Sequence, residues 1–201
     1  MDKNAMRALS YGLFVLTAGG EKDNGCIINT AMQVTTSPNR ISITVCKENY
    51  THDLIRDTGL FNVSVLDESA PFEVFEHFGF SSGRNVDKFV DDGMPRSANG
   101  LIYLPAYTCS FISGKVFSQI DLGTHTMFLA DVTDGEVLSK NAPMTYAYYH
   151  ANVKPRPAAK SSEKKSWVCR ICGYVHEGDL PDDFICPLCK HGIDDFELIG
   201  G

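Results

Sequence analysis

Trp167-Val-Cys169-Arg-Ile-Cys172-Gly-Tyr-Val175, followed by Phe184-Ile-Cys186-Pro-Leu-Cys189, places two Cys-x-x-Cys pairs close together near the C-terminus. So short a segment cannot bury enough apolar surface to fold without further support. Four thiolates in two such pairs can surround one tetrahedral metal ion, whose binding then contributes folding free energy. The stretch therefore predicts a small metal-stabilised module with Cys169, Cys172, Cys186 and Cys189 as its ligands.

Iron and zinc both suit four sulfur ligands. The cysteines alone favour a structural zinc ribbon, but the aromatic residues around them, Trp167, Tyr174, Phe184 and Phe196, favour iron. Together with Leu180-Pro-Asp-Asp-Phe184, the two cysteine motifs resemble rubredoxin, which implies one iron that carries a single electron. Only 13 residues, 173–185, separate the pairs, and this short spacing is more similar to the module at the end of rubrerythrins.

Composition indicates an ordinary globular protein with a small addition. The chain has 201 residues, of which 43% are hydrophobic and 21% charged. It has no 18-residue apolar run and no basic segment ahead of an apolar one, so neither a membrane span nor a secretion signal is expected. Seven cysteines, four of them in metal spacing, favour a reducing compartment, and we expect a cytoplasmic protein. The net charge of -7 disfavours nucleic acid as a partner.

The metal module is acidic. From residue 166 onward, seven Asp and Glu residues stand against Arg170 and Lys190. Such a charge is either an ordinary solvated face or a docking surface that attracts a basic partner. The sequence leaves both interpretations open.

Residues 1–151 have the pattern of one domain rich in strands. Apolar or alternating runs bounded by turns occupy residues 11–18, 26–32, 41–46, 60–66, 107–122 and 125–139, the last with a turn at Asp134-Gly135. Two short helices are expected, at residues 51–57 with Thr51 as N-cap and at residues 69–78 with a stripe of phenylalanines for the core. This arrangement predicts a mainly β fold, a barrel or a sandwich.

A polar segment rich in Pro, Ala, Ser and Lys follows this domain. It predicts a flexible linker over residues 152–165, between a first domain at 1–151 and the metal module at 166–201. Extended at about 3.3 Å per residue, such a linker reaches up to about 50 Å. The module could therefore meet much of the first domain's surface or a neighbouring protomer.

A one-electron metal module needs a source of electrons. No Gly-x-Gly-x-x-Gly follows a strand and no Gly-x-x-x-x-Gly-Lys-Ser/Thr loop is present, so a doubly wound dinucleotide domain is not expected. Polar side chains instead cluster at residues 29–38, 47–52 and 81–85. The N–H groups at the start of the helix near Thr51, with Lys47 ahead of it and Arg84 elsewhere, could bind an anion.

Four stretches, taken in order, resemble the flavin reductase-like proteins: Gly25-Cys-Ile-Ile-Asn-Thr-Ala-Met-Gln-Val-Thr-Thr-Ser-Pro38, Lys47-Glu-Asn-Tyr-Thr-His52, Gly83-Arg-Asn-Val-Asp-Lys-Phe89 and Gly123-Thr-His-Thr-Met-Phe-Leu-Ala-Asp-Val132. The resemblance covers nearly all of residues 5–150. It implies an FMN-binding split β-barrel of the flavin reductase-like type with short helices, which works as a homodimer with flavins near the subunit interface. The whole chain then combines this barrel with a small rubredoxin-like metal module.

The same resemblance implies cofactor-binding residues at matching positions. Those expected around the flavin ring and ribityl chain are Asn29, Thr30, Ala31, Val34 and Thr35; those expected around the phosphate are Lys47, Asn49, Thr51 and Arg84. His125 matches a histidine associated with the flavin and nicotinamide site, although a histidine bound to backbone in a strand would look the same. Cys26, Cys46 and Cys109 lie among apolar neighbours and are expected to be inert cysteines of the core.

The combination resembles the high-molecular-weight rubredoxins. This implies an enzyme in which NADH or NADPH reduces FMN, FMN reduces the iron, and the iron reduces a soluble acceptor, expected to be a flavodiiron protein that reduces nitric oxide or dioxygen. One alternative is a flavin reductase that supplies free reduced flavin to a monooxygenase and carries a structural zinc module. A second is a non-enzymatic binding protein built from the same two parts.

Overall fold

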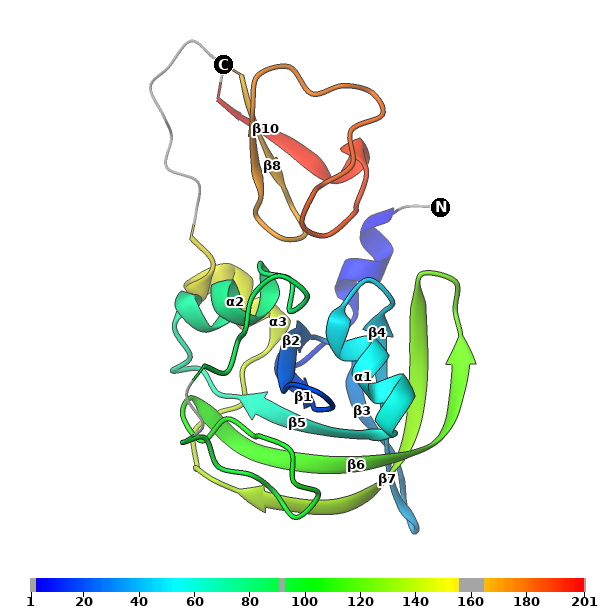
Figure 1. Cartoon of the computed structure of the whole chain (residues 1–201). Helices are drawn as coiled ribbons and strands as arrows, with labels where there is room; N and C mark the ends of the chain where they lie inside the picture. Colours follow the sequence, from blue (N-terminus) through cyan, green and yellow to red (C-terminus); the bar gives the residue numbers. More distant parts are fainter. Residues whose placement is uncertain (1–2, 91–92, 156–164, 201) are drawn as a thin grey trace. The chain divides into compact units, whose positions relative to one another are not determined.

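The computed structural model describes residues 3–90, 93–155 and 165–200 and divides the chain into two compact units, residues 1–153 and 154–201. Residues 156–164 of the predicted linker lie outside the described residues. Within the described part, no helix combines the length and apolar character needed to cross a membrane. Each unit has its own sheet, as Figure 1 shows.

The first unit is built on one antiparallel seven-stranded sheet in the order β2-β1-β5-β6-β7-β4-β3 (Figure 1). Its strands are β1 (Phe14–Ala18), β2 (Asn24–Ile28), β3 (Ala31–Thr36), β4 (Asn39–Cys46), β5 (Leu60–Leu66), β6 (Thr108–Asp121) and β7 (His125–Val137). The mainly β expectation is confirmed. The 26–32 run, expected as one strand, is divided between β2 and β3, and β2 pairs with β1 as a hairpin.

The long strands β6 and β7 differ from the expectation in one respect. Asp134 and Gly135 do not form a turn, because β7 continues through them opposite Ser113 and Ile112. The irregularity instead lies in the pairing, which shifts register between Ser113 and Gly114. The carboxylate of Asp134 accepts the N–H of Gly135, a local bond that is compatible with an extended strand.

The helices are short and stand outside the sheet. They are η1 (Lys3–Ala8), α1 (Tyr50–Thr58), α2 (Phe72–Gly79), α3 (Tyr146–Tyr148) and η2 (Tyr149–Val153). The N-cap of α1 is Asn49, whose side chain makes no capping hydrogen bond, and Thr51 lies inside the helix instead of capping it. Phe75 and Phe78 of α2 are buried, which confirms the predicted aromatic core stripe.

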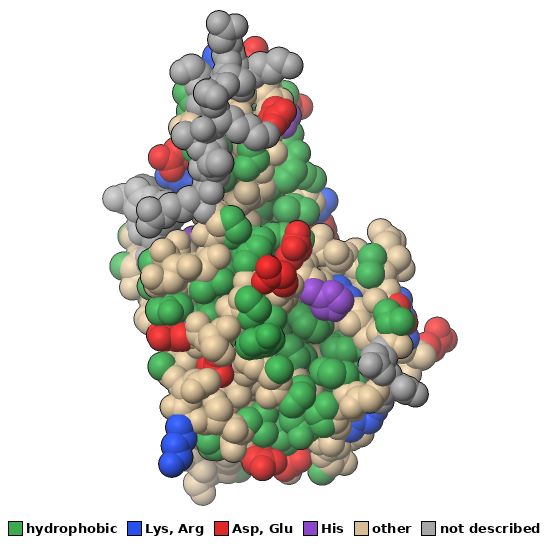
Figure 2. Space-filling view, turned by 90° about the vertical axis from the view of Figure 1, so that its left-hand side faces the viewer, with side chains coloured by type: hydrophobic (Ala, Val, Ile, Leu, Met, Phe, Trp, Pro, Cys, Tyr) green, Lys and Arg blue, Asp and Glu red, His purple; other side chains and the backbone are tan. Residues whose placement is uncertain are grey.

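Two apolar clusters stabilise this unit, one between the sheet and α1 and one under α2 and α3. The second reaches the surface through partly buried aromatic residues such as Phe72 and Tyr146, and Figure 2 shows hydrophobic side chains gathered over this face. A polar residue, Asn62, is fully buried beside the first cluster. Its amide nitrogen donates to the carbonyls of Leu101 and Ile102 at 3.0 and 3.2 Å, which ties the 96–102 loop to β5.

The second unit has a three-stranded sheet in the order β10-β8-β9. Its elements are β8 (Ser166–Cys169), β9 (Val175–Glu177), η3 (Ile193–Asp195) and β10 (Phe196–Gly200). Among the described residues, its core cluster contains three buried ones, Cys169, Cys186 and Phe196, with partly buried aromatic residues around them. So small an apolar core agrees with the expectation that this module needs a further source of stability.

Asn62 gives a test of the first unit. Replacing it with Ala should lower the free energy of unfolding by about 3 kcal/mol, because several buried partners lose their hydrogen bonds together. Urea denaturation measures the change. Asn39→Ala, at the exposed first residue of β4, is the matched control and should change stability little. Equal effects of the two substitutions would contradict the role given to Asn62.

Candidate metal centre and flavin-binding face

The four cysteines converge on one point. Their sulfur atoms all lie within 4.8 Å of one another, and the Cys169–Cys189 and Cys172–Cys186 sulfur pairs are 3.5 Å apart. Cys169 and Cys186 are fully buried, whereas Cys172 and Cys189 are half-buried. The sequence prediction that these four residues come together is confirmed.

Both cysteine loops have the same backbone form. The N–H of Gly173 donates to the carbonyl of Cys169 at 2.8 Å, and the N–H of Lys190 donates to the carbonyl of Cys186 at 2.9 Å. Gly173 and Lys190 both have left-handed backbones, with φ of 85° and 60°. Glycine adopts this conformation without strain, whereas Lys190 does so against its preference. Each loop thus turns sharply enough to aim two sulfurs at one point.

The sulfurs compete for protons when no metal holds them. Hydrogen bonding from Cys172 lowers the pKa of Cys169, and bonding to Cys169 raises the pKa of Cys172 to about 12 and that of Cys189 as well. The opposite directions of these pKa shifts reflect sulfurs that lie close enough to hydrogen-bond one another and share protons. A divalent or trivalent cation would replace these protons, so the donor set fits a tetrahedral thiolate-binding metal such as iron or zinc.

Aromatic rings surround the sulfurs as expected. Phe184 packs against Phe196 with ring centroids 5.3 Å apart and against Tyr174 at 6.4 Å, and Trp167 belongs to the same cluster. These rings replace water on the buried side of the site. The aromatic rings pack around the sulfurs, so removal of the metal would destabilise the apolar cluster of the second unit.

In the first unit, one sheet face gathers several residues of interest. Ile43, Val45 and Phe128 point into the core, so the alternating residues of β4 and β7 point outward. Pairing then aligns Cys46 with His125 on the outer face, and Thr44 with Met127. The half-buried His125 side chain therefore lies on the outer face of the sheet, opposite the core.

The outer face continues onto the flanking strands. Met32 of β3 pairs with Ser42, which pairs with Leu129, and Ile120 of β6 pairs with Met127. Met32 is 66% exposed and Ile120 46%. The sequence reasoning did not find this apolar face, because its members come from four strands that are far apart in sequence.

Several residues assigned to the flavin lie at one end of this face. Thr30 is held beside Thr44, whose carbonyl accepts from the Thr30 hydroxyl at 2.7 Å. Asn29 directly precedes Thr30, and Ala31 pairs with Ile43. Lys47 follows β4, and its backbone N–H donates to the carbonyl of Thr124, beside His125. Residues predicted from separate stretches are thus neighbours in space.

Val34 and Thr35 lie elsewhere. Thr35 pairs with Arg40 at the start of β4, and its hydroxyl donates to the carbonyl of Pro38. At about 3.3 Å per residue, the length of β4 separates this end from Lys47 by about 20 Å. Val34 and Thr35 therefore lie toward the far end of β3, away from the other predicted flavin residues.

Three of the four predicted phosphate ligands already have side-chain partners within the chain. The ammonium group of Lys47 donates to Asp121 at 2.7 Å, and Arg84 is paired with Asp53. Thr51 is fully buried, and its hydroxyl oxygen accepts from Asn24 at 2.8 Å. The Asn49 side chain makes no capping hydrogen bond at the start of α1, where the first N–H groups lack helical acceptors. The assignment of these residues to a phosphate stays a prediction.

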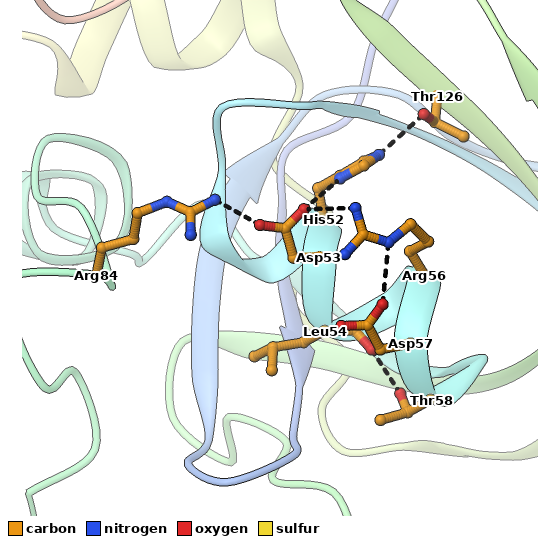
Figure 3. A network of polar contacts seen from close by, with 8 residues as sticks. All are labelled: His52, Asp53, Leu54, Arg56, Asp57, Thr58, Arg84 and Thr126. Carbon is orange, nitrogen blue, oxygen red and sulfur yellow. Dashed lines mark hydrogen bonds and ion pairs between the residues drawn. The ribbon is translucent and has the colours of Figure 1, made fainter.

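Asp53 is the centre of a polar network on α1 (Figure 3). Burial alone would raise the pKa of Asp53, but hydrogen bonds from Arg84 and His52 and the charges of Arg84 and Arg56 hold this pKa below its usual range. His52 continues the network to the hydroxyl of Thr126 at 2.9 Å. Sequence reasoning noted the basic residues but missed Asp53, since an acidic residue in the first turn of a helix has an ordinary explanation.

Of the remaining cysteines, Cys26 is buried, and desolvation raises its pKa to about 11. Cys46 and Cys109 are half-buried. The raised pKa agrees with an inert Cys26. Cys46 lies directly opposite His125 in the sheet, so it belongs to the outer face and not to the core, contrary to the expectation for this residue.

Known proteins match both units. The flavin reductase like domain matches residues 6–155, and the rubredoxin-like domain of rubrerythrin matches residues 167–197. The high molecular weight rubredoxin of Moorella thermoacetica is 35% identical over 99% of this chain and its own entire length. The ferric-chelate reductase (NAD(P)H) of Archaeoglobus fulgidus is 35% identical over 82% of this chain and all of that protein.

A solved structure has the same fold. The NADH:FAD oxidoreductase of Streptomyces globisporus C-1027, in complex with NAD and FAD fragments, covers 79% of this chain and 93% of its own, with a TM-score of 0.64 and 22% identity. Fold and sulfur site together define a flavin reductase-like oxidoreductase with a rubredoxin-like module. The chain belongs to the family of high-molecular-weight rubredoxins.

The metal centre can be tested through the chain's one tryptophan, Trp167. Cys186→Ala should unfold the second unit, because a structural metal site supplies about 10 kcal/mol or more. We expect the emission of Trp167 to shift to the red while the thermal unfolding of the first unit stays unchanged. Cys109→Ala, outside the sulfur set, is the control, and an unshifted emission in Cys186→Ala would contradict a metal-dependent module.

Proposed function

We propose that this enzyme passes electrons from NAD(P)H to FMN on the first unit, then to one iron held by Cys169, Cys172, Cys186 and Cys189, and finally to a soluble acceptor. The observation that carries the proposal is the presence, in one chain, of a flavin reductase fold and a four-sulfur metal site. A flavin can accept two electrons together as a hydride, whereas a tetrathiolate iron carries one at a time. A covalent link keeps the two sites at a high effective concentration.

The protein residues would position the flavin. Asn29, Thr30 and the backbone of Ala31 would contact the flavin at the end of the outer face, since the Ala31 side chain packs on the core with Ile43. Asn49, Lys47 and the first turn of α1 would hold its phosphate. Support comes from the Asn49 side chain, which makes no capping hydrogen bond, and from the positive end of the nine-residue helix α1. His125 would lie beside the flavin and the nicotinamide, at the same end of β4 and β7. Val34, Thr35, Thr51 and Arg84 are the further predicted contacts.

Iron is favoured over zinc by the match to the rubredoxin-like domain and by the aromatic shell around the sulfurs. The half-buried Cys172 and Cys189 would offer an edge through which an electron can leave. The acidic surface of the module would attract a basic region of the acceptor.

The proposed acceptor is a flavodiiron protein that reduces nitric oxide or dioxygen. The putative diflavin flavoprotein A 3 of Synechocystis is 26% identical over 69% of this chain. The matching segment makes up 23% of that protein, so a related domain also occurs within a larger flavoprotein. Seven cysteines without a disulfide framework support a cytoplasmic setting for this reaction.

We also propose a homodimer that covers the outer sheet face. Four apolar side chains are exposed here: Met32, Phe117, Ile120 and Leu122. A second copy of the chain, packed on this face, would remove them from water. His125 lies on the same face, so pairing of two copies would enclose the flavin end of the site. Analytical ultracentrifugation of the purified protein would measure its oligomeric state.

A second function has some support. The reductase component of a resorcinol hydroxylase from Rhizobium is 24% identical over 72% of this chain, and four thiolates bind zinc as readily as iron. On that view the chain supplies free reduced flavin, and the module is structural. Colour separates the two functions, since a ferric tetrathiolate is red and a zinc site is colourless.

Cys169→Ser tests the proposed relay. Reduction of bound flavin by NADH should stay within about twofold of the unmodified protein, since the variant leaves the first unit intact. Transfer to a flavodiiron protein should fall by about a hundredfold, because the flavin loses the tethered iron and must meet the acceptor by diffusion. Anaerobic stopped-flow spectroscopy follows both steps. Equal loss of both activities, or undiminished transfer, would count against the relay.

A further inference from the structure

A lysine lies against the first of the two cysteine loops. The second compact unit begins at Lys154, in the segment for which the sequence indicated only a linker. A Cβ on Gly173 would fall 2.6 Å from Cε and 3.4 Å from Nζ of Lys154. The lysine side chain therefore packs on the backbone of Gly173, the residue that directly follows Cys172.

Gly173 allows this contact for two reasons. Its backbone is left-handed, a conformation that glycine adopts without strain. It also lacks a side chain, and atoms of Lys154 occupy the space that a Cβ would need. In the second loop, the corresponding position directly after Cys189 is taken by Lys190, which is left-handed as well. Each cysteine loop thus has a lysine at the same place, one from the loop itself and the other from a segment distant in sequence.

The charged neighbours of Lys154 are sulfurs. Lys154 is half-buried, and burial lowers its pKa. The charges that act in the opposite direction come from three of the four metal-ligating cysteines: Cys172, Cys169 and Cys189. Among the described residues, no carboxylate contributes to this balance. The ammonium group is therefore available to interact with whatever negative charge the sulfur site carries.

We propose that Lys154 tunes the metal centre: its positive charge raises the reduction potential of the iron that the four sulfurs would hold. This inference rests on the proposed function, because it concerns that iron. Four thiolates leave one net negative charge around ferric iron and two around ferrous iron. A fixed cation interacts more strongly with the more negative state, so it favours the reduced form.

The contribution of Lys154 is electrostatic, because the sulfur geometry has other supports. The backbone N–H groups of Gly173 and Lys190 close the two loops on the carbonyls of Cys169 and Cys186, and neither bond involves Lys154. Its half-buried position also reduces screening by water and salt, which weakens exposed charges. In the proposed relay reduced flavin is the electron donor, so a higher potential of the iron makes this transfer more favourable.

Lys154→Met in the full-length, iron-loaded protein tests the proposal, because methionine keeps an unbranched stem and removes the charge. At a fixed applied potential, the ratio of ferrous to ferric iron should fall about tenfold, the lower end of what a neighbouring charge does to a titration. This corresponds to a potential lower by about 59 mV. Spectroelectrochemical titration measures it. Lys154→Arg should restore most of the shift, and an unchanged potential in Lys154→Met would overturn the proposal.

Lys165→Met is the matched control. It removes the same charge from the same unit, but Lys165 is exposed and donates to Asp179 at 2.8 Å, so the potential should change little. Equal shifts in the two methionine variants would contradict a specific role for Lys154. A red-shifted emission of Trp167 in Lys154→Met would show that the lysine is structural, which also overturns the proposal.

Metal analysis of the freshly isolated protein tests the proposed function separately. Zinc in that sample would refute the iron relay, whereas the potential of the protein reloaded with ferrous iron would still show whether Lys154 acts on the sulfur site.

Discussion

The antiparallel pairing of β4 with β7 is the constraint on which the first unit's site depends. Seven consecutive residue pairs, from Arg40 with Asp131 to Cys46 with His125, fix which side chains share a face. A slip of one residue would turn His125 and Met127 into the core and bring Phe128 out. The buried Ile43, Val45 and Phe128 prevent that slip, because each is almost completely removed from water. Hydrophobic burial on one face therefore sets the geometry of the other.

The second unit depends on a different force. Its sheet is small and its apolar core contains few residues, so backbone pairing alone cannot hold it. Two loops of identical form, each ending in a left-handed residue, aim four sulfurs at one point. The metal that these sulfurs bind is then both the centre of stability and the proposed electron carrier. One set of bonds serves both purposes, so the loss of one ligand affects both.

Charge is arranged differently in the two units. Near the start of α1, three cations described in the structure are already matched by a carboxylate or a carbonyl: Arg84, Lys47 and Lys22. These contacts stabilise the site without a ligand. A phosphate held by Arg84 or Lys47 would have to displace the carboxylate partner of that residue. In the metal module, acidic residues outnumber basic ones and give a net negative surface. The first arrangement suits selective binding of a small anion, and the second suits attraction of a protein.

The sequence by itself determined the four sulfur ligands, the hairpin of β1 and β2 and the family, because Cys-x-x-Cys spacing, alternation and ordered motifs are local properties of the chain. Only the tertiary structure decided that Thr51 is buried, that Asn49 occupies the N-cap position of α1, and that Lys22 stands beside Tyr50. It also decided that Met32 and His125 share a face. These facts depend on strand register and on contacts between distant segments, and no local pattern encodes either of them.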